Sequence, residues 1–374
     1  MTALKPNSLY ERLAKLANSH SSRPKLPPGH PLDSKWERLL LQEPKKLFNA
    51  DGTIRFDQLE EFRRRSIFVS DMAPVSDFAN LDPALWWKKF LSHPIRGLEA
   101  LIKENISGSR RGARQLLRDV FEVLKLEGAL DLLGKYPVAD TPGAPFAFQV
   151  DGYSFNLRWA RHIYFHNLMR RYLGPEIKRR ERFISMDIGS SYGIFPSIFK
   201  SEYPNSTHVL VDFPDQHVLA YYYLASIFPE ARIATLSDLI AEPQITREFL
   251  AEFDFVLAPV ATYEMFAPNS VDMVTNFFSF GEMRREWFLS YVEGAPFRTA
   301  EFLFICNRFE SAPRHDPTYD SDLTILDYPL SQFEKMFFGV FPLYPYHLAR
   351  KHLVNYEKIP YSSQYFDFLG RRRA

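Results

Sequence analysis

Residues 183–193 read FISMDIGSSYG, an apolar run that ends in an aspartate and continues into a turn of glycine and serine. A short apolar run bounded by glycine is typical of a buried strand. The following residues, Ile194 to Lys200, have the composition of a helix. We therefore predict a strand, a turn and a helix, in which Gly189 and Gly193 adopt backbone conformations that other residues rarely take.

The alternation of strands and helices continues on the carboxyl side of this turn. Strands are predicted at 208–211, 232–235, 255–258, 272–276 and 302–307, and helices at 156–172, 218–228, 245–253 and 280–292. We expect residues 344–354 to supply the last strands. Strands that alternate with helices form a largely parallel sheet through right-handed crossovers. The predicted fold class is therefore α/β.

The amino-terminal region has a different pattern and is predicted to be mainly helical. Ser34 to Glu37 have the form of a capping box before an apolar run, and residues 113–133 carry a broad apolar face at helical spacing. Three prolines and a glycine then fall between Pro137 and Pro145, which is typical of a linker. We predict two domains, residues 1–145 and 146–374.

Composition limits the classes of function. The net charge is +1, with acids and bases interspersed, which argues against nucleic acid as the main partner. A single cysteine, Cys306, excludes a disulfide framework within the chain. No segment approaches the roughly 20 consecutive apolar residues that a transmembrane helix needs. We expect a cytoplasmic protein without a membrane span, and the sequence leaves homo-oligomer formation open.

The turn after the first strand has the features of a ligand-binding loop. Its small residues allow close approach to the backbone, and the helix that follows offers N–H groups at its amino terminus. In the dinucleotide fingerprint G-x-G-x-x-G the middle position is glycine, whereas here it is Ser191. Asp187, before the turn, suits a ligand with an ammonium group and suits a pyrophosphate poorly. NAD is therefore the less favoured ligand.

A second carboxylate supports a nucleoside ligand. Asp212 ends the next predicted strand and lies 19 residues beyond Gly193. An acid about 20 residues past such a turn accepts hydrogen bonds from ribose hydroxyls. The alternative is that Asp212 caps the following helix, although Asp215 is also placed for that role.

Four segments now show a family resemblance. They are MDIGSSYG (186–193), VLVDFPD (209–215), VDMVTN (271–276) and SFGEM (279–283). They resemble class I S-adenosylmethionine-dependent methyltransferases, and are most similar to the sugar O-methyltransferase group. The resemblance covers about residues 150–310 and implies a Rossmann-like domain with a mostly parallel, seven-stranded sheet.

The resemblance also implies which residues bind S-adenosyl-L-methionine. Asp187, Gly189 and Gly193 would frame its methionine part, and Ser190 and Ser191 complete that turn. Asp212 would contact the ribose diol, with Phe213 beside it. Residues 259–262, beginning with Pro259, would lie near the adenine, and Asn276 would lie where cofactor and acceptor meet.

Two candidates for the catalytic base follow later strands. Glu282 follows the strand that ends at Asn276, but Ser279 to Glu282 also has the form of a capping box, so Glu282 is equally suited to cap its own helix. His315 and Asp316 follow the strand that ends near Asn307, and prolines on both sides favour a surface turn there.

A polar stripe on one predicted helix and an acidic loop could each bind an ion, but in both cases an ordinary surface segment is favoured. Arg158, His162, His166 and Arg170 recur every fourth residue on one predicted helix, where a solvated face is favoured over an anion site. A divalent cation could orient a diol acceptor. Glu310, Asp316, Asp320 and Asp322 could bind one together, but a plain acidic loop is favoured, so no metal ligands are assigned.

The leading functional hypothesis is methyl transfer to a hydroxyl of a sugar, either within a glycan or in a sugar-containing metabolite. The helical amino-terminal half would then cover the cleft and select the acceptor. One alternative keeps the cofactor but changes the acceptor to a non-sugar small molecule or to nitrogen. Another is a cofactor-binding fold that serves as a non-catalytic assembly partner.

Overall fold

The computed structural model describes residues 91, 109–138, 147–311, 322–343, 346–350, 356–360 and 364–373. The chain divides into two compact units. One contains residues 1–55, 170–341 and 362–374, and the other contains residues 56–169 and 342–361. The predicted domain boundary at residue 145 lies in a segment outside the described residues and stays a prediction, as does the helical character of residues 1–90.

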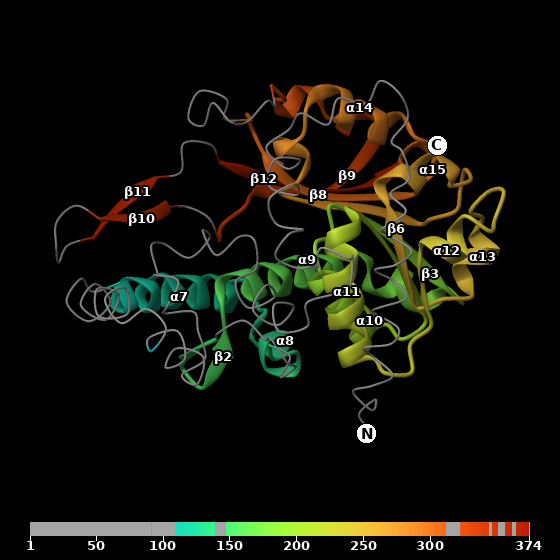
Figure 1. The fold of residues 1–374 in the computed structure, drawn as a ribbon. Helices are drawn as coiled ribbons and strands as arrows, with labels where there is room; N and C mark the ends of the chain where they lie inside the picture. Colours follow the sequence, from blue (N-terminus) through green and yellow to red (C-terminus); the bar gives the residue numbers. More distant parts are fainter. Residues whose placement is uncertain are drawn as a thin grey trace. The chain divides into compact units, whose positions relative to one another are not determined.

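The first of these units is built on an eight-stranded sheet (Figure 1). Its strands are β3 (Phe183–Ile188), β4 (Ser206–Asp212), β5 (Ile233–Ala234), β6 (Phe255–Pro259), β7 (Met273–Phe277), β8 (Phe302–Arg308), β9 (Phe333–Val340) and β12 (Tyr365–Arg372), in the order β5-β6-β4-β3-β7-β8-β12-β9. The first six of that order are parallel, and β12 pairs antiparallel with both β8 and β9.

The structure confirms the α/β class and every predicted strand from 183 to 307, but it corrects two expectations. The sheet has eight strands rather than seven, because the short strand β5 pairs with β6 and extends that edge. Residues 344–354 do not supply the last strands. Part of that stretch forms β10 (Tyr346–Arg350), which pairs with β11 (Tyr356–Pro360) in a separate hairpin.

Helices cover both faces of the eight-stranded sheet (Figure 1). On one face lie α10 (Ile194–Glu202) and α11 (Pro214–Ile227), and on the other lie α12 (Leu236–Leu239), α13 (Arg247–Ala251), α14 (Arg285–Glu293) and α15 (Ala295–Thr299). Alternate residues of a strand point to opposite faces, so both faces must be apolar in such a layered fold. All six residues of β3 and all seven of β4 are buried accordingly.

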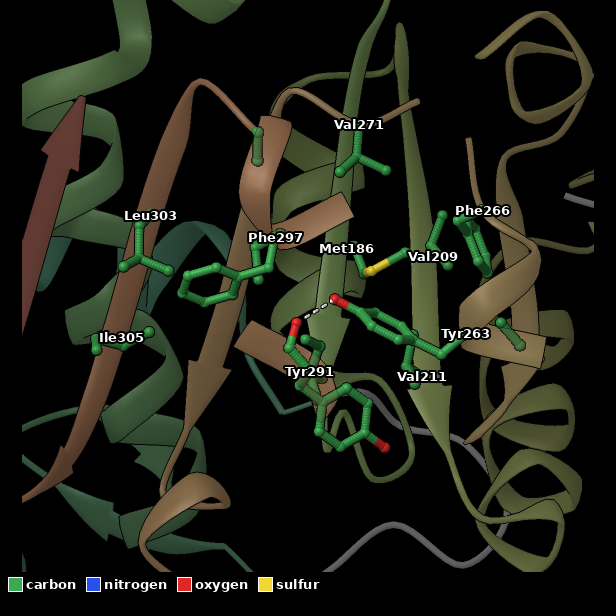
Figure 2. Packing of buried hydrophobic residues seen from close by; sticks show 14 of the residues in the cluster. Met186, Val209, Val211, Tyr263, Phe266, Val271, Tyr291, Phe297, Leu303 and Ile305 are labelled. Atoms are coloured by element: carbon green, nitrogen blue, oxygen red, sulfur yellow. Dashed lines mark hydrogen bonds between the residues drawn. The ribbon is translucent and has the colours of Figure 1, made fainter. Parts of the chain in front are cut away.

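Each face packs its own core. Met186, Val209 and Val211 pack beneath α14 and α15 together with Tyr263 and Phe297, as Figure 2 shows. The opposite face is rich in aromatic rings from the strands and from α10. There Phe195 packs edge-on against Phe277 and Phe304, and Phe199 packs against Phe183. Aromatic side chains bury large areas, so these two layers hold the strand ends in place.

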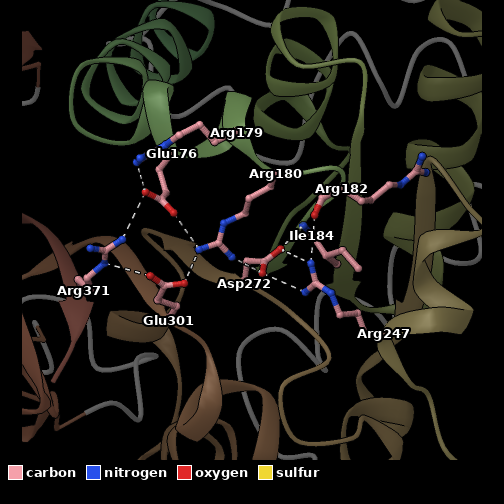
Figure 3. Close-up of polar contacts among 9 residues, drawn as sticks. All are labelled: Glu176, Arg179, Arg180, Arg182, Ile184, Arg247, Asp272, Glu301 and Arg371. Atoms are coloured by element: carbon pink, nitrogen blue, oxygen red, sulfur yellow. Dashed lines mark hydrogen bonds and ion pairs between the residues drawn. The ribbon is translucent and has the colours of Figure 1, made fainter. Parts of the chain in front are cut away.

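A cluster of ion pairs lies at the end of the sheet where the parallel strands begin, which we call the amino-terminal edge (Figure 3). The opposite end, where these strands finish, is the carboxyl edge. The Asp272 side chain is 7% exposed and accepts hydrogen bonds from Arg180, Arg247 and the backbone N–H of Ile184. Glu301 pairs with Arg180 and with Arg371. These contacts join β3, β7 and β12 at the edge opposite the ligand-binding turn predicted from the sequence.

The other unit contains α7 (Ser109–Leu126), α8 (Leu130–Lys135), the hairpin of β1 (Phe148–Val150) and β2 (Tyr153–Phe155), and α9 (Leu157–Arg179) as far as Met169. Phe121 of α7 packs on Phe155, and the indole of Trp159 donates a hydrogen bond to the Tyr136 carbonyl. Among the described residues, no helix has the length and apolar character needed to cross a bilayer.

Candidate ligand-binding site

The turn between β3 and α10 lies where the strand order reverses. β4 flanks β3 on one side and β7 flanks it on the other, and in open α/β sheets ligands bind at the carboxyl ends of strands at such a point. Gly189, Ser191 and Gly193 all have left-handed backbone angles, with φ of 74°, 52° and 86°. A Cβ on Gly189 would overlap the Ser279 side chain, so only glycine fits there.

Asp212 holds this turn. Its Oδ2 accepts a 2.6 Å hydrogen bond from the Ser191 backbone N–H, and its Oδ1 accepts a 2.7 Å bond from the N–H of Phe213. The Gly189 N–H donates to the Val211 carbonyl at 2.8 Å. The predicted turn and the predicted second carboxylate are therefore in direct contact. A carboxylate oxygen has two lone-pair sites, so Asp212 can still accept from a ligand hydroxyl.

Asp187 is a buried carboxylic acid at the foot of the same turn. It is 5% exposed, and its Oδ1 accepts a 2.7 Å hydrogen bond from the Thr275 hydroxyl. Burial raises the pKa of Asp187, the Thr275 hydrogen bond lowers it and the Asp212 charge raises it, and together they bring it to about 7. A group whose ionised form is disfavoured in this way is stabilised by a nearby cation. The site is thus suited to a positively charged ligand group.

One further polar group of the turn is buried without a described partner. The Ser190 hydroxyl is shielded from solvent and makes no hydrogen bond with the described residues. A buried hydroxyl that lacks a partner costs free energy, which a bound ligand would recover. With Asp187, it is the second observation that fits a polar ligand in this turn.

Asn276 ties the turn to the neighbouring strands. It is fully buried; its amide donates to the Ile188 carbonyl at 2.6 Å, and its Oδ1 accepts from the Phe280 N–H at 3.0 Å. The Asn307 amide, at the end of β8, also donates to that oxygen, at 2.9 Å. The structure thus places Asn276 directly behind the turn, where it positions backbone, and its predicted contact with the cofactor stays a prediction.

Pro259 and Tyr291 lie beside Asp212. Pro259 ends β6 in register with Asp212, and its carbonyl accepts a bond from the buried Thr262 hydroxyl. In Figure 2 the Tyr291 ring lies toward the carboxyl ends of β3 and β4, with its hydroxyl turned away from Tyr263. Burial, and secondly the Asp212 charge, raise the pKa of Tyr291. These residues flank the side of Asp212 where a nucleoside is expected.

Glu282 lies at the carboxyl end of β7 and makes an ion pair. One of its carboxylate oxygens lies 3.5 Å from a guanidinium nitrogen of Arg308, with side chains 16% and 14% exposed. The Ser279 side chain makes no capping hydrogen bond, so the expected capping box does not form. Glu282 belongs instead to a short 3-10 turn, 280–282, that precedes α14.

The remaining predictions concern the alternative base, the acidic loop and the polar stripe on α9. His315 and Asp316 lie outside the described residues, as do two members of the acidic loop. No group of three or more potential metal ligands is found among the described residues. The expected solvated stripe on α9 is wrong for His166, which is fully buried and packs edge-on against Tyr136.

Four residues of the site were not predicted from the sequence: Thr275, Tyr291, Asn307 and Arg308. Thr275 is brought to Asp187 by the register of β3 with β7, and Asn307 reaches Asn276 through the pairing of β7 with β8. One signal was available: both asparagines stand near the carboxyl ends of predicted strands, as Asp187 and Asp212 do. Parallel strands bring such ends together.

No protein-family model matches this chain, and no curated protein matches it in sequence. Solved structures with a similar fold include a protein of Thermoplasma acidophilum (14% identity, 57% of this chain and 90% of that chain, TM-score 0.33). TehB from Haemophilus influenzae is another (10% identity, 57% and 67%, TM-score 0.34). A third is phosphoethanolamine N-methyltransferase 2 of Haemonchus contortus, solved with S-adenosylhomocysteine (13% identity, 56% and 52%, TM-score 0.34). We base the function on the geometry of the site.

Proposed function

We propose that this chain is an S-adenosylmethionine-dependent O-methyltransferase that acts on a hydroxyl of a sugar, within a glycan or in a sugar-containing metabolite. The observation that supports it best is the turn 187–193. There a buried acid, Asp187, and a second carboxylate, Asp212, meet at the point where strand order reverses. This arrangement suits a ligand with both a positive charge and a diol.

The charge of the site favours S-adenosylmethionine over NAD. The methionine part carries an ammonium group and the reactive centre is a sulfonium, and both would stabilise the ionised form of Asp187. A pyrophosphate would instead be brought close to two carboxylates, which costs free energy. Asp212 suits ribose hydroxyls, because a carboxylate only accepts hydrogen bonds.

The chain's own residues have separate roles in this proposal. S-adenosylmethionine supplies the methyl group when it is bound. The turn and Asp212 hold the cofactor in one orientation, and alignment of the reacting atoms is itself a large part of such catalysis. Glu282 accepts a hydrogen bond from the acceptor hydroxyl and takes its proton. His315 and Asp316 remain alternative proposals for that base.

Support for a sugar acceptor comes from the segment SFGEM, by resemblance, and from the position of Glu282 in the 3-10 turn that follows β7. A methyltransferase for a non-sugar small molecule is the second candidate. The site's intact set of turn residues argues against a non-catalytic assembly partner, which would not need a buried acid there. A cytoplasmic location and self-association stay predictions.

Calorimetry tests the cofactor. S-adenosylmethionine and S-adenosylhomocysteine should bind in the micromolar range, and NAD should not bind. Asp212→Ala should weaken binding by about 30-fold or more, because it removes a charged acceptor and the support of Ser191. Glu252→Gln, at an exposed carboxylate, is the matched control and should bind normally. Absence of binding by both sulfur ligands would contradict the proposal.

Transfer of a labelled methyl group tests the reaction. Incubation with nucleotide sugars and glycan fragments should label a hydroxyl, and Asp212→Ala should abolish the signal. Glu282→Gln should retain cofactor binding and lose transfer. If Glu282→Gln transfers at the wild-type rate, Glu282 is not the base. Loss of transfer on chelation, with recovery on addition of magnesium, would establish a metal-dependent variant of the reaction.

A further inference from the structure

A cluster of aromatic and charged side chains lies at the carboxyl edge of β7 and β8, beyond the turn. Arg308 ends β8, pairs in register with Tyr365 of β12, and donates a 3.0 Å hydrogen bond to the Tyr365 hydroxyl. Its guanidinium lies over the Tyr365 ring, 5.7 Å from the ring centroid, and pairs with Glu282. Arg308 is therefore held in one orientation by two neighbours on different elements.

Phe278 completes this cluster with an unusual backbone. Its φ is 70°, in the left-handed region that bulky residues rarely adopt. The preceding residue, Phe277, packs against Phe195 beneath the sheet. The left-handed turn then directs the Phe278 ring to the edge, where it packs edge-on against Tyr365 and Phe341 at 5.2 and 5.4 Å.

Such a conformation costs free energy and persists where the surroundings enforce it, often at ligand-binding positions. A 2.7 Å hydrogen bond from the Phe278 N–H to the Cys306 carbonyl holds the Phe278 backbone in this conformation. The cluster also adjoins the cofactor turn. Ser279, next in the chain, fills the space where a Cβ of Gly189 would lie.

The chemistry of the cluster narrows what it could bind. A guanidinium donates hydrogen bonds and a carboxylate accepts them, so the Arg308–Glu282 pair offers both without net charge. Neighbouring hydroxyls of a ring match that combination. Aromatic rings beside them can pack against an apolar C–H face. An anionic acceptor is disfavoured, because the Glu282 and Asp212 carboxylates lie at the same edge and would repel it.

We propose that Phe278, Glu282, Arg308 and Tyr365 form the acceptor-binding site, and that it takes a neutral polyhydroxylated ring such as a pyranoside. The inference rests on the proposed function, since it places the acceptor beside the cofactor turn. Phe278 and Tyr365 contact the C–H face of the ring, and Arg308 and Glu282 bind adjacent hydroxyls. Arg308 also positions the Glu282 carboxylate.

Steady-state kinetics with full-length protein tests the assignment. The acceptors are methyl α-D-glucopyranoside and methyl α-L-rhamnopyranoside, with catechol as a planar diol that has no C–H face. Phe278→Asn removes the ring but tolerates the left-handed backbone. Arg308→Lys keeps the charge and loses the planar fork. Tyr365→Phe removes only the hydroxyl. Tyr172→Phe and Arg232→Lys are matched controls.

Phe278→Asn and Arg308→Lys should each raise the KM for a glycoside about 10-fold or more, because buried polar groups and ring contacts would be lost. Tyr365→Phe should give a smaller rise. The Kd for S-adenosylmethionine should stay within about 2-fold of wild type in every variant, since none touches the turn. Retention of that Kd also shows that each variant folds, so a loss of structure is distinguished from a loss of acceptor binding.

Four outcomes would overturn the inference. Wild-type KM values in Phe278→Asn and Arg308→Lys would show that the acceptor binds elsewhere, with the proposed function intact. Methylation of catechol with no glycoside labelled would contradict the acceptor class, as would cofactor binding without transfer to any glycoside. Failure of wild type to bind S-adenosylmethionine would remove the proposed function itself and this inference with it.

Discussion

The two edges of the eight-stranded sheet hold carboxylates in different ways. At the amino-terminal edge, Asp272 meets two guanidinium groups and a backbone N–H (Figure 3). At the carboxyl edge, Asp187 accepts a hydrogen bond from the Thr275 hydroxyl, and Asp212 accepts from the backbone N–H groups of Ser191 and Phe213. The first arrangement neutralises charge within the protein. The second places carboxyl oxygens at the predicted ligand-binding turn, so we assign stability to one edge and ligand binding to the other.

Asp272→Ala tests the stabilising edge and should have the largest effect. Its removal leaves Arg180 and Arg247 close together without the carboxylate between them, and loss of one partner from a buried ion pair costs about 3–5 kcal/mol. The free energy of unfolding in urea measures this. The affinity for S-adenosylmethionine should stay within about 2-fold, because distant sites act independently.

The exposed pair of Arg232 and Glu252 provides the control for that experiment. Arg232→Ala should change the free energy of unfolding by less than about 1 kcal/mol, since exposed ion pairs contribute little. If Asp272→Ala instead weakened cofactor binding strongly with little loss of stability, the division between the two edges would be wrong.

Asp187 should make the free energy of unfolding depend on pH. Its folded pKa is about 7, against an ordinary value of 3.8, so the folded state retains a proton that the unfolded state has lost between those values. The contribution of protonated Asp187 to the free energy of unfolding is therefore fully present below about pH 4 and is lost as the pH rises through 7. Between pH 4.5 and 6.5 the loss should be about 2–3 kcal/mol, since one proton corresponds to about 1.4 kcal/mol per pH unit.

Unfolding measured in urea across this pH range should show a steeper decline in wild type than in Asp187→Asn, which has no proton to lose. Asp151→Asn, at an exposed aspartate in a turn, should keep the wild-type slope. Saturating S-adenosylmethionine should flatten the slope, because its positive charge favours the ionised form of Asp187. Equal slopes in wild type and Asp187→Asn would remove the basis for a cationic ligand.

The two edges also differ in how far the sequence predicts them. The strand, turn and helix of 183–200 and the position of Asp212 at the end of the next strand follow from local pattern and spacing. The partners of Asp187 and Asp272 do not, because they come from residues 88 and 92 positions away and depend on strand register. Register is set by packing of the whole sheet, which a single sequence does not display.

Gly189→Ala tests whether the turn has space for a side chain at this position. The new Cβ would overlap Ser279, and the φ of 74° is strained for any side chain. We expect a loss of about 2 kcal/mol in unfolding free energy and weaker cofactor binding. Gly128→Ala is the matched control, since Gly128 has a φ of 67° and nothing within 4 Å of an added Cβ. Gly128→Ala should lower the free energy of unfolding by only about 1 kcal/mol, the cost of the strained backbone angle without any overlap.

Two neighbouring tyrosines allow the smallest and most selective comparison, because both belong to one buried cluster (Figure 2). The Tyr263 hydroxyl donates a 2.8 Å hydrogen bond to the Tyr291 carbonyl, whereas the Tyr291 hydroxyl lies toward the strand ends and Asp212. Tyr263→Phe should therefore lower the free energy of unfolding by about 1 kcal/mol and leave cofactor affinity unchanged.

Tyr291→Phe should do the reverse, raising the Kd for S-adenosylmethionine about 3-fold with little change in stability, since a hydroxyl beside Asp212 acts on a ligand and not on the core. Calorimetry and urea unfolding on the same two variants separate these effects. If both substitutions changed stability alone, the carboxyl edge near Tyr291 would be part of the packed core. The ligand would then have to lie near the ends of β7 and β8, and not beside Asp212 at the end of β4.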